Sequence, residues 1–147
     1  MIYKLTIVAA PILASLTYRD AIAHLGATGI VKERMDYFKA SQSNLKKIRM
    51  HIGNENYTST IPLADSITSW SARMSKYFPA GSDIKPSEAS PRIWSDFEGF
   101  TAAAQLSWKA TISLAKAAEI GDRDAVINAF KETAGSCKSC HKLYRLK

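Results

Sequence analysis

The sequence predicts an all-α protein, an antiparallel up-down four-helix bundle. Apolar residues recur at spacings of three, four and seven through four separate segments, and no segment alternates apolar and polar residues as a strand does. The last two segments are joined only by Gly-Asp at 121–122, so their helices must run antiparallel. The last segment contains Cys-Lys-Ser-Cys-His at 137–141, an attachment signal for a c-type haem. The expected fold is therefore a four-helix bundle with covalently bound haem c.

The first predicted helix covers about residues 26–50. Lys, Glu and Asp residues mostly separate its apolar positions, which places the apolar side chains on one face. Gly-Asn-Glu-Asn at 53–56 ends the helical pattern, and a polar loop follows to about Thr60. The apolar positions of this helix are Ile30 or Val31, Met35, Phe38, Leu45, Ile48 and Ile52.

The second predicted helix has Pro62 in its first turn and continues to Tyr77. Phe-Pro-Ala-Gly-Ser at 78–82 ends it. Residues 82–90 are rich in Ser, Pro and charge, so we expect a surface connection there. The apolar side of this helix carries Leu63, Ile67, Trp70, Met74 and Tyr77.

The third predicted helix has Ser90 as its N-cap and Pro91 as its first residue. Gly121 suits its C-terminus, and Asp122 suits the N-cap of a fourth helix over about residues 123–145. The apolar positions of the third helix are Ile93, Trp94, Phe97, Phe100, Ala104, Trp108, Ile112 and Ala115, and those of the fourth are Val126, Phe130, Thr133 or Ala134, Cys137, His141 and Tyr144.

The Cys-x-x-Cys-His pattern has a direct chemical interpretation. On a helix, Cys137 and Cys140 project from one face, so two thiols can form thioethers with the two vinyl groups of one haem. His141 then turns an imidazole nitrogen toward the iron. A zinc site needs four ligands, and His24 and His51 stand at no recognised ligand spacing. A redox thiol pair would open a helix in a βαβ unit, and a plain disulfide leaves the histidine unexplained.

The first residues resemble an export signal. Lys4 precedes an apolar stretch over 5–16 that is too short to span a bilayer, and Ala-Ile-Ala at 21–23 matches a cleavage site. We expect cleavage after Ala23, which leaves residues 24–147 as one domain without stable membrane insertion. An apolar core helix or an uncleaved anchor is the alternative interpretation.

The charge balance is basic. The whole chain carries 20 Lys and Arg against 13 Asp and Glu, and residues 24–147 keep 18 against 12, a formal charge of +6. Such a surface favours acidic partners. The basic residues are scattered, and no recognition motif accompanies them, so we expect no nucleic acid as a partner.

Three segments together resemble the cytochromes c′, periplasmic haem proteins of bacteria. They are Gly-Ser-Cys-Lys-Ser-Cys-His-Lys-Leu-Tyr-Arg at 135–145, Pro-Arg-Ile-Trp-Ser-Asp at 91–96 and Val-Lys-Glu-Arg at 31–34. The resemblance implies a periplasmic location and one haem c bound through Cys137 and Cys140, with His141 as the proximal iron ligand. It also implies that Arg145 lies against the proximal haem face and that Arg34 lies near the haem propionates.

The resemblance further implies that Phe38 covers the distal face of the iron. Phenylalanine has no donor atom, so we expect a five-coordinate, high-spin iron in a crowded and apolar pocket. Phe78, Phe100 and Leu106 are similar to residues that line this pocket in the family. Met35 offers the alternative, because it lies three residues before Phe38 and a rotation of the helix would make it a sixth ligand.

Two functions follow from this site. The first is binding of small diatomic gases, nitric oxide and more weakly carbon monoxide, together with electron exchange. The second is a dedicated electron carrier, six-coordinate and low-spin if Met35 binds the iron. Lys138, Lys142, Arg145 and Lys147 would then present a positive surface to an acidic periplasmic redox partner. We expect no enzymatic activity, because Phe38 stands where a distal acid or base would be needed. The family also implies a homodimer.

Overall fold

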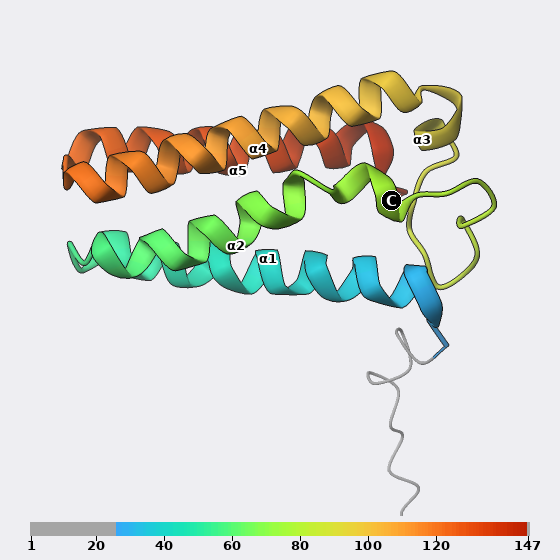
Figure 1. The fold of residues 1–147 in the computed structure, drawn as a ribbon, viewed down its shortest axis with the longest axis horizontal. Helices are drawn as coiled ribbons and strands as arrows, with labels where there is room; N and C mark the ends of the chain where they lie inside the picture. Colours follow the sequence, from blue (N-terminus) through green and yellow to red (C-terminus); the bar gives the residue numbers. More distant parts are fainter. Residues whose placement is uncertain (1–25, 147) are drawn as a thin grey trace, which may run out of the picture.

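A computed structural model describes residues 26–146 of the protein (Figure 1). These residues form helices and connections, and the one β-type pairing among them is an isolated antiparallel bridge between Ala89 and Arg145. The expected all-α class is therefore confirmed. The predicted signal peptide at 1–23, together with His24, lies outside the described residues.

Four long helices make up the bundle, and three short helical segments lie between them. The long helices are α1 (Gly29–Gly53), α2 (Ile61–Ser71), α4 (Phe97–Ile120) and α5 (Arg123–Tyr144). The short segments are the 3₁₀ helices η2 (Thr58–Thr60) and η3 (Met74–Tyr77) and the one-turn helix α3 (Arg92–Ser95).

Each long helix runs antiparallel to its two neighbours, in the order α1, α2, α4, α5 around the bundle (Figure 1). Helix α4 packs extensively against both α2 and α5, whereas α1 meets α5 much more sparsely. The seam between α1 and α5 is thus the most open side of the bundle. The long connection over residues 78–91 caps the end at which α5 finishes.

The link between α4 and α5 forms as the sequence predicts. Gly121 has a left-handed φ of 77°, a conformation that glycine adopts without a Cβ penalty, and its amide bonds to the carbonyl of Ala117. The carboxylate of Asp122 accepts hydrogen bonds from the amides of Asp124 and Ala125, which caps the first turn of α5.

The second and third helices are each shorter than predicted. Helix α2 ends at Ser71 rather than Tyr77, and the chain continues as the separate 3₁₀ helix η3. The third predicted helix is interrupted at Asp96, whose φ of −138° and ψ of 55° are not helical. The carboxylate of Asp96 accepts a hydrogen bond from the amide of Gly99 and so caps the N-terminus of α4. An aspartate within an otherwise apolar run was therefore the sequence signal for a helix start at this point.

The core stripe of α4 also differs from the prediction. Phe97 and Trp108 are 44% and 37% exposed, whereas Ser107 and Thr111 are buried. Small hydroxyl residues occupy the interior because they find partners there: Thr111 bonds to Thr68 at 2.8 Å, and Ser107 lies 3.3 Å from the hydroxyl of Ser71. The buried side chains of α4 are Phe100, Ala104, Ser107, Thr111, Leu114, Ala115, Ala117 and Ala118.

Asp96 also connects the start of α4 to the end of α5. Its Oδ2 accepts a hydrogen bond of 2.8 Å from the hydroxyl of Tyr144, a buried residue. This hydrogen bond is the main reason that the pKa of Asp96 lies below its ordinary value, and the amide of Gly99 and the charge of Arg92 act in the same direction. The contact is tight, because a Cβ placed on Gly99 would lie 2.6 Å from the Tyr144 oxygen.

We predict that Asp96→Asn lowers stability at neutral pH but not in acid. Asparagine still caps a helix, so the substitution removes mainly the charge. A carboxyl group with a lowered pKa stabilises the fold above its unfolded pKa, and that contribution is lost as the pH falls through the lower, folded value. Urea unfolding of the parent and the variant at several pH values should give midpoints that converge below the ordinary value of 3.8. A constant difference at every pH would contradict this account.

Candidate functional site

A cavity of about 580 Å³ lies among α1, α2, α4 and α5 at the end of the bundle that the 78–91 connection caps. Its size is in the range of small-molecule and cofactor sites. Nine of the ten residues that the sequence assigned to the haem site line this one cavity: Arg34, Met35, Phe38, Phe78, Phe100, Cys137, Cys140, His141 and Arg145. Leu106, by contrast, is 62% exposed and does not contact the cavity, so its assignment to the pocket was wrong.

The two thiols face the cavity from one side of α5. Cys137 and Cys140 are both free and half-buried. Burial raises the pKa of each thiol, that of Cys140 to about 11, so both stay protonated at neutral pH. Such thiols are poor metal ligands and weak nucleophiles until they are activated. Among residues 26–146, no group of three His, Cys, Asp or Glu side chains could hold a metal ion, which disfavours the zinc alternative.

His141 lies at the α1/α5 seam, next to the thiols. Its ring faces that of Phe38 on α1, with the ring centroids 6.3 Å apart and the planes at 73°. Desolvation lowers the pKa of His141 and the charge of Arg145 lowers it further, whereas Glu88 opposes this shift. The neutral imidazole is the form that binds metals. The two rings are thus edge-to-face neighbours among the residues that line the cavity, one with a donor nitrogen and one without a donor atom.

Aromatic rings make up the wall on the Phe38 side. The Phe38 ring contacts Trp70 edge to face at a centroid distance of 5.3 Å and Phe78 at 6.4 Å, and Phe78 contacts Phe100 at 4.8 Å. Trp70, Phe78 and Phe100 are buried. These interlocked rings hold Phe38 in place, so the wall beside it is apolar and crowded.

Two thioethers also line the cavity. Met35 lies on α1 next to Phe38, as the sequence suggested, and Met74 reaches the cavity from η3. Met74 had been assigned only to packing. The break between α2 and η3 places it at the cavity, and no pattern in the sequence marks that break strongly.

Arg34 is a buried cation at the closed end of the cavity. It is only 2% exposed and donates to the carbonyl oxygen of Tyr77 at 3.0 Å. Its other acceptors are the hydroxyl and carbonyl oxygens of Ser82 and the hydroxyl of Ser87, so it ties α1 to the 78–91 connection. Burial lowers the pKa of Arg34, and the charge of Asp83 opposes this. Within the described part of the chain no carboxylate forms an ion pair with it.

Arg145 lies at the other end of the same connection. It is exposed and forms a two-point contact with Glu88, at 2.7 Å from Nε and 2.5 Å from a terminal nitrogen. The amide of Ser90 donates to the carbonyl oxygen of Tyr144, and the amide of Leu146 donates to that of Glu88. The connection is therefore fastened to α5 as well as to α1, and it closes the cavity between Arg34 and Arg145.

Several polar groups in the cavity wall were not expected. Ser71 and Ser107 line the cavity, and their hydroxyls lie 3.3 Å apart. The indole nitrogen of Trp70 is buried without a hydrogen-bond partner in the described structure. The pocket is thus less uniformly apolar than the sequence suggested. The sequence feature that could have indicated this polarity was Ser107, a serine at a buried position of α4.

The lining fits a haem c. Two thiols on one helix face can each become an uncharged thioether, which removes a titratable group from a poorly solvated wall. One imidazole stands beside them, and the apolar rings of Phe38, Trp70 and Phe78 line the same cavity. The Arg34 guanidinium is buried without an ion-pair partner in residues 26–146, and although Tyr77, Ser82 and Ser87 accept from its terminal nitrogens, its charge favours an anionic group such as a propionate nearby. No helix within the described residues is long and apolar enough to cross a membrane.

Comparison with known proteins gives consistent matches. A cytochrome c′ of Rhodospirillum rubrum is 32% identical to the chain over 145 residues, which are 97% of each protein. A cytochrome c-556 of Agrobacterium tumefaciens is 45% identical over 71 residues, 48% of this chain and 56% of that one.

Solved structures agree with the sequence matches. A ferrous variant of cytochrome c′ from Alcaligenes xylosoxidans with bound NO superposes with a TM-score of 0.72 at 26% identity, covering 80% of this chain and 94% of that one. The sequence profile described as Cytochrome C' matches residues 29–145, the whole of the bundle. The chain therefore belongs to the cytochrome c′ family of c-type haem proteins.

Proposed function

We propose that this protein is a periplasmic cytochrome c′ whose five-coordinate, high-spin haem iron binds nitric oxide and carbon monoxide and exchanges electrons. The observation that carries the proposal is that Phe38, which has no donor atom, is the aromatic neighbour of His141 among the residues that line the cavity. His141 would hold the iron of a bound haem, and Phe38, a ring without a donor atom, would supply no second protein ligand, so that iron would remain able to bind a small molecule.

The residues around the cavity have separate roles in this proposal. Cys137 and Cys140 hold the haem covalently, and His141 supplies the one protein ligand to the iron. Arg34 offsets the negative charge of a propionate in a buried setting. The haem itself supplies an iron that can change oxidation state and bind diatomic molecules. Arg145, paired with Glu88, lines the same cavity as His141.

Ligand selection follows from the wall around Phe38. The aromatic rings of Phe38, Trp70 and Phe78 leave space only for small molecules and give bound oxygen little hydrogen-bond stabilisation. Nitric oxide binds iron strongly without such help. The structurally similar Alcaligenes xylosoxidans variant carries NO in its ferrous form, which supports the same ligand here.

A dedicated electron carrier is the second candidate function. The observation that favours it is the presence of Met35 in the cavity wall, three residues from Phe38. Ligation by its sulfur would give a six-coordinate, low-spin iron and raise the reduction potential. In that case the protein would serve a periplasmic redox partner and bind gases poorly.

Three further features belong to the proposal. Export through the signal peptide at 1–23 places the domain of residues 24–147 in the periplasm, where the haem is attached. The protein is not an enzyme, since Phe38 offers no acid or base to a bound ligand. Two copies of the chain pair as a homodimer, as the family resemblance implies.

Nitric oxide titration tests the gas-binding function. We predict that the ferrous holoprotein changes its Soret and visible absorption on addition of nitric oxide, with one equivalent bound per haem. Carbon monoxide should bind at the same position but more weakly. A ferrous spectrum that stays unchanged at saturating nitric oxide would rule out the proposed function.

Substitution of the two cavity methionines tests the coordination number. We predict that Met35→Leu leaves the ferrous absorption spectrum high-spin and unchanged, because Met35 packs without binding the iron. Met74→Leu, which removes the other thioether of the cavity, is the matched control. If the parent spectrum is low-spin and only Met35→Leu converts it to high-spin, the electron-carrier alternative is correct.

A further inference from the structure

Basic residues gather on the two helices that border the open side of the cavity. From residue 37 to residue 54 the chain has no acidic residue, and from residue 133 to its end it has none. These two stretches contain most of the α1 and α5 residues that line the cavity, including Lys39 and His141. Helix α4, by contrast, carries acidic and basic residues together, and α2 has one acidic residue and no basic one. The two stretches that border the α1/α5 seam are thus free of acidic residues, and the one acidic residue that lines the cavity is Glu88 of the 78–91 connection, which is paired with Arg145.

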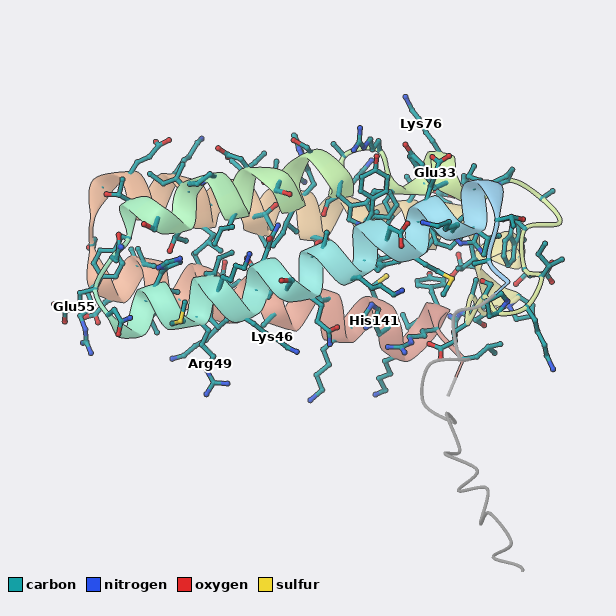
Figure 2. The ribbon with its side chains drawn as sticks, turned by 90° about the horizontal axis from the view of Figure 1, so that it is seen from below. Glu33, Lys46, Arg49, Glu55, Lys76 and His141 are labelled. Atoms are coloured by element: carbon teal, nitrogen blue, oxygen red, sulfur yellow. The ribbon has the colours of Figure 1, made fainter. Side chains whose placement is uncertain are left out.

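On α1 the basic residues form a stripe. Lys39, Lys46 and Arg49 follow one another at spacings of seven and three, so they share a helix face with the cavity residues Met35 and Gln42. Figure 2 shows Lys46 and Arg49 projecting toward the edge of the bundle along which His141 of α5 lies. The stripe therefore borders the α1/α5 seam.

On α5, Lys138 and Lys142 complete the surface. Lys138 directly follows Cys137, and Lys142 directly follows His141. Both lysine side chains are exposed. We use the term basic face for five residues: Lys39, Lys46, Arg49, Lys138 and Lys142. All five are exposed, and within residues 26–146 none of them forms an ion pair. Arg145 is excluded because Glu88 neutralises it, and Lys147 lies outside the described residues.

The acidic residues nearest to this region do not compensate the charge. Asp36 is bound to Lys32 at 2.5 Å, and its position on α1 is nearly opposite that of Phe38. Glu132 on α5 belongs to a separate groove between α4 and α5. Unpaired like charges on one surface repel one another and destabilise the folded state, so they are best explained by an anionic partner.

We infer that the basic face is the docking surface for an acidic electron-transfer protein, whose redox centre is brought to the α1/α5 seam beside the cavity that would hold the haem. The inference rests on the electron exchange proposed above and identifies the partner of that site. In the transfer, one electron leaves the reduced centre of the donor protein and enters the ferric iron, which becomes ferrous. Complementary charge increases the rate of encounter and fixes the orientation.

An acidic protein fits this surface better than an anionic membrane does. The basic residues border the cavity that would hold the haem, so docking there brings a partner close to the iron. That proximity has a function only for a partner that carries a redox centre. If docking depends on charge, the rate constant of electron transfer should fall steeply as the ionic strength rises. The reason is that exposed charges are screened beyond about 8 Å in physiological salt.

The test compares two adjacent lysines of α1. Lys46→Glu and Lys47→Glu change the net charge equally, and both residues are exposed, but Lys47 lies on the side of α1 away from the cavity. The probe is a reduced flavodoxin, an acidic one-electron donor, mixed with the ferric holoprotein in a stopped-flow instrument. The flavin hydroquinone becomes the semiquinone as the iron is reduced.

At low ionic strength, Lys46→Glu should lower the second-order rate constant by roughly fivefold or more, and Lys47→Glu by less than about twofold. The difference should disappear at about 0.5 M salt. Calorimetric titration with oxidised flavodoxin should show the same order of affinities without electron transfer. Equal effects of the two substitutions in both measurements would overturn the inference.

Two controls separate this inference from the proposed function. Ferrous Lys46→Glu, reduced with dithionite, should bind nitric oxide as the parent does; if neither protein binds nitric oxide, the proposed function fails whatever the docking result. Vesicles of phosphatidylglycerol test the membrane. The inference is overturned if the parent binds these vesicles in physiological salt, Lys46→Glu abolishes that binding, and flavodoxin reduces the parent and Lys46→Glu at equal rates. The basic face would then be a membrane-binding surface.

Discussion

The haem-site end of this bundle depends on a buried positive charge. Arg34 is held by acceptors from the 78–91 connection and by the face of the Phe78 ring, 4.3 Å from its guanidinium carbon. A buried guanidinium without partners would cost several kcal/mol, so this network of hydrogen bonds is required for the fold around it. The same network closes the cavity and fixes the position of α1, which carries Phe38.

The two ends of the bundle are stabilised in different ways. Near the α1 to α2 and α4 to α5 turns the core is aliphatic, with Ile48, Leu114 and Val126 fully buried, each contributing about 2 kcal/mol by burial. Around the cavity the core consists of aromatic rings together with the Arg34 network and the Asp96 to Tyr144 hydrogen bond. This arrangement leaves a hollow that a flat, apolar cofactor can fill, while the aliphatic end maintains the helix packing.

Periodicity and motif spacing predicted the bundle, the α4 to α5 turn and the side chains that line the cavity. Those features depend on local signals: apolar spacing, Gly121, Asp122 and the cysteine motif. The breaks after Ser71 and at Asp96 were missed, because tertiary contacts such as the Tyr144 hydrogen bond decide whether a polar residue continues a helix or caps one. Ser107 was missed for a similar reason, since its partner Ser71 comes from another helix. The Glu88 contact of Arg145 joins residues far apart in the chain, and no local pattern announces it.

In the proposed site His141 is the one protein ligand of the haem iron, and Phe38 supplies no second ligand. The most direct test is the electron paramagnetic resonance spectrum of the ferric holoprotein at neutral pH. The account predicts an axial, high-spin signal that disappears on reduction. A rhombic, low-spin signal, abolished by Met35→Leu, would contradict it and show that a thioether occupies the sixth position.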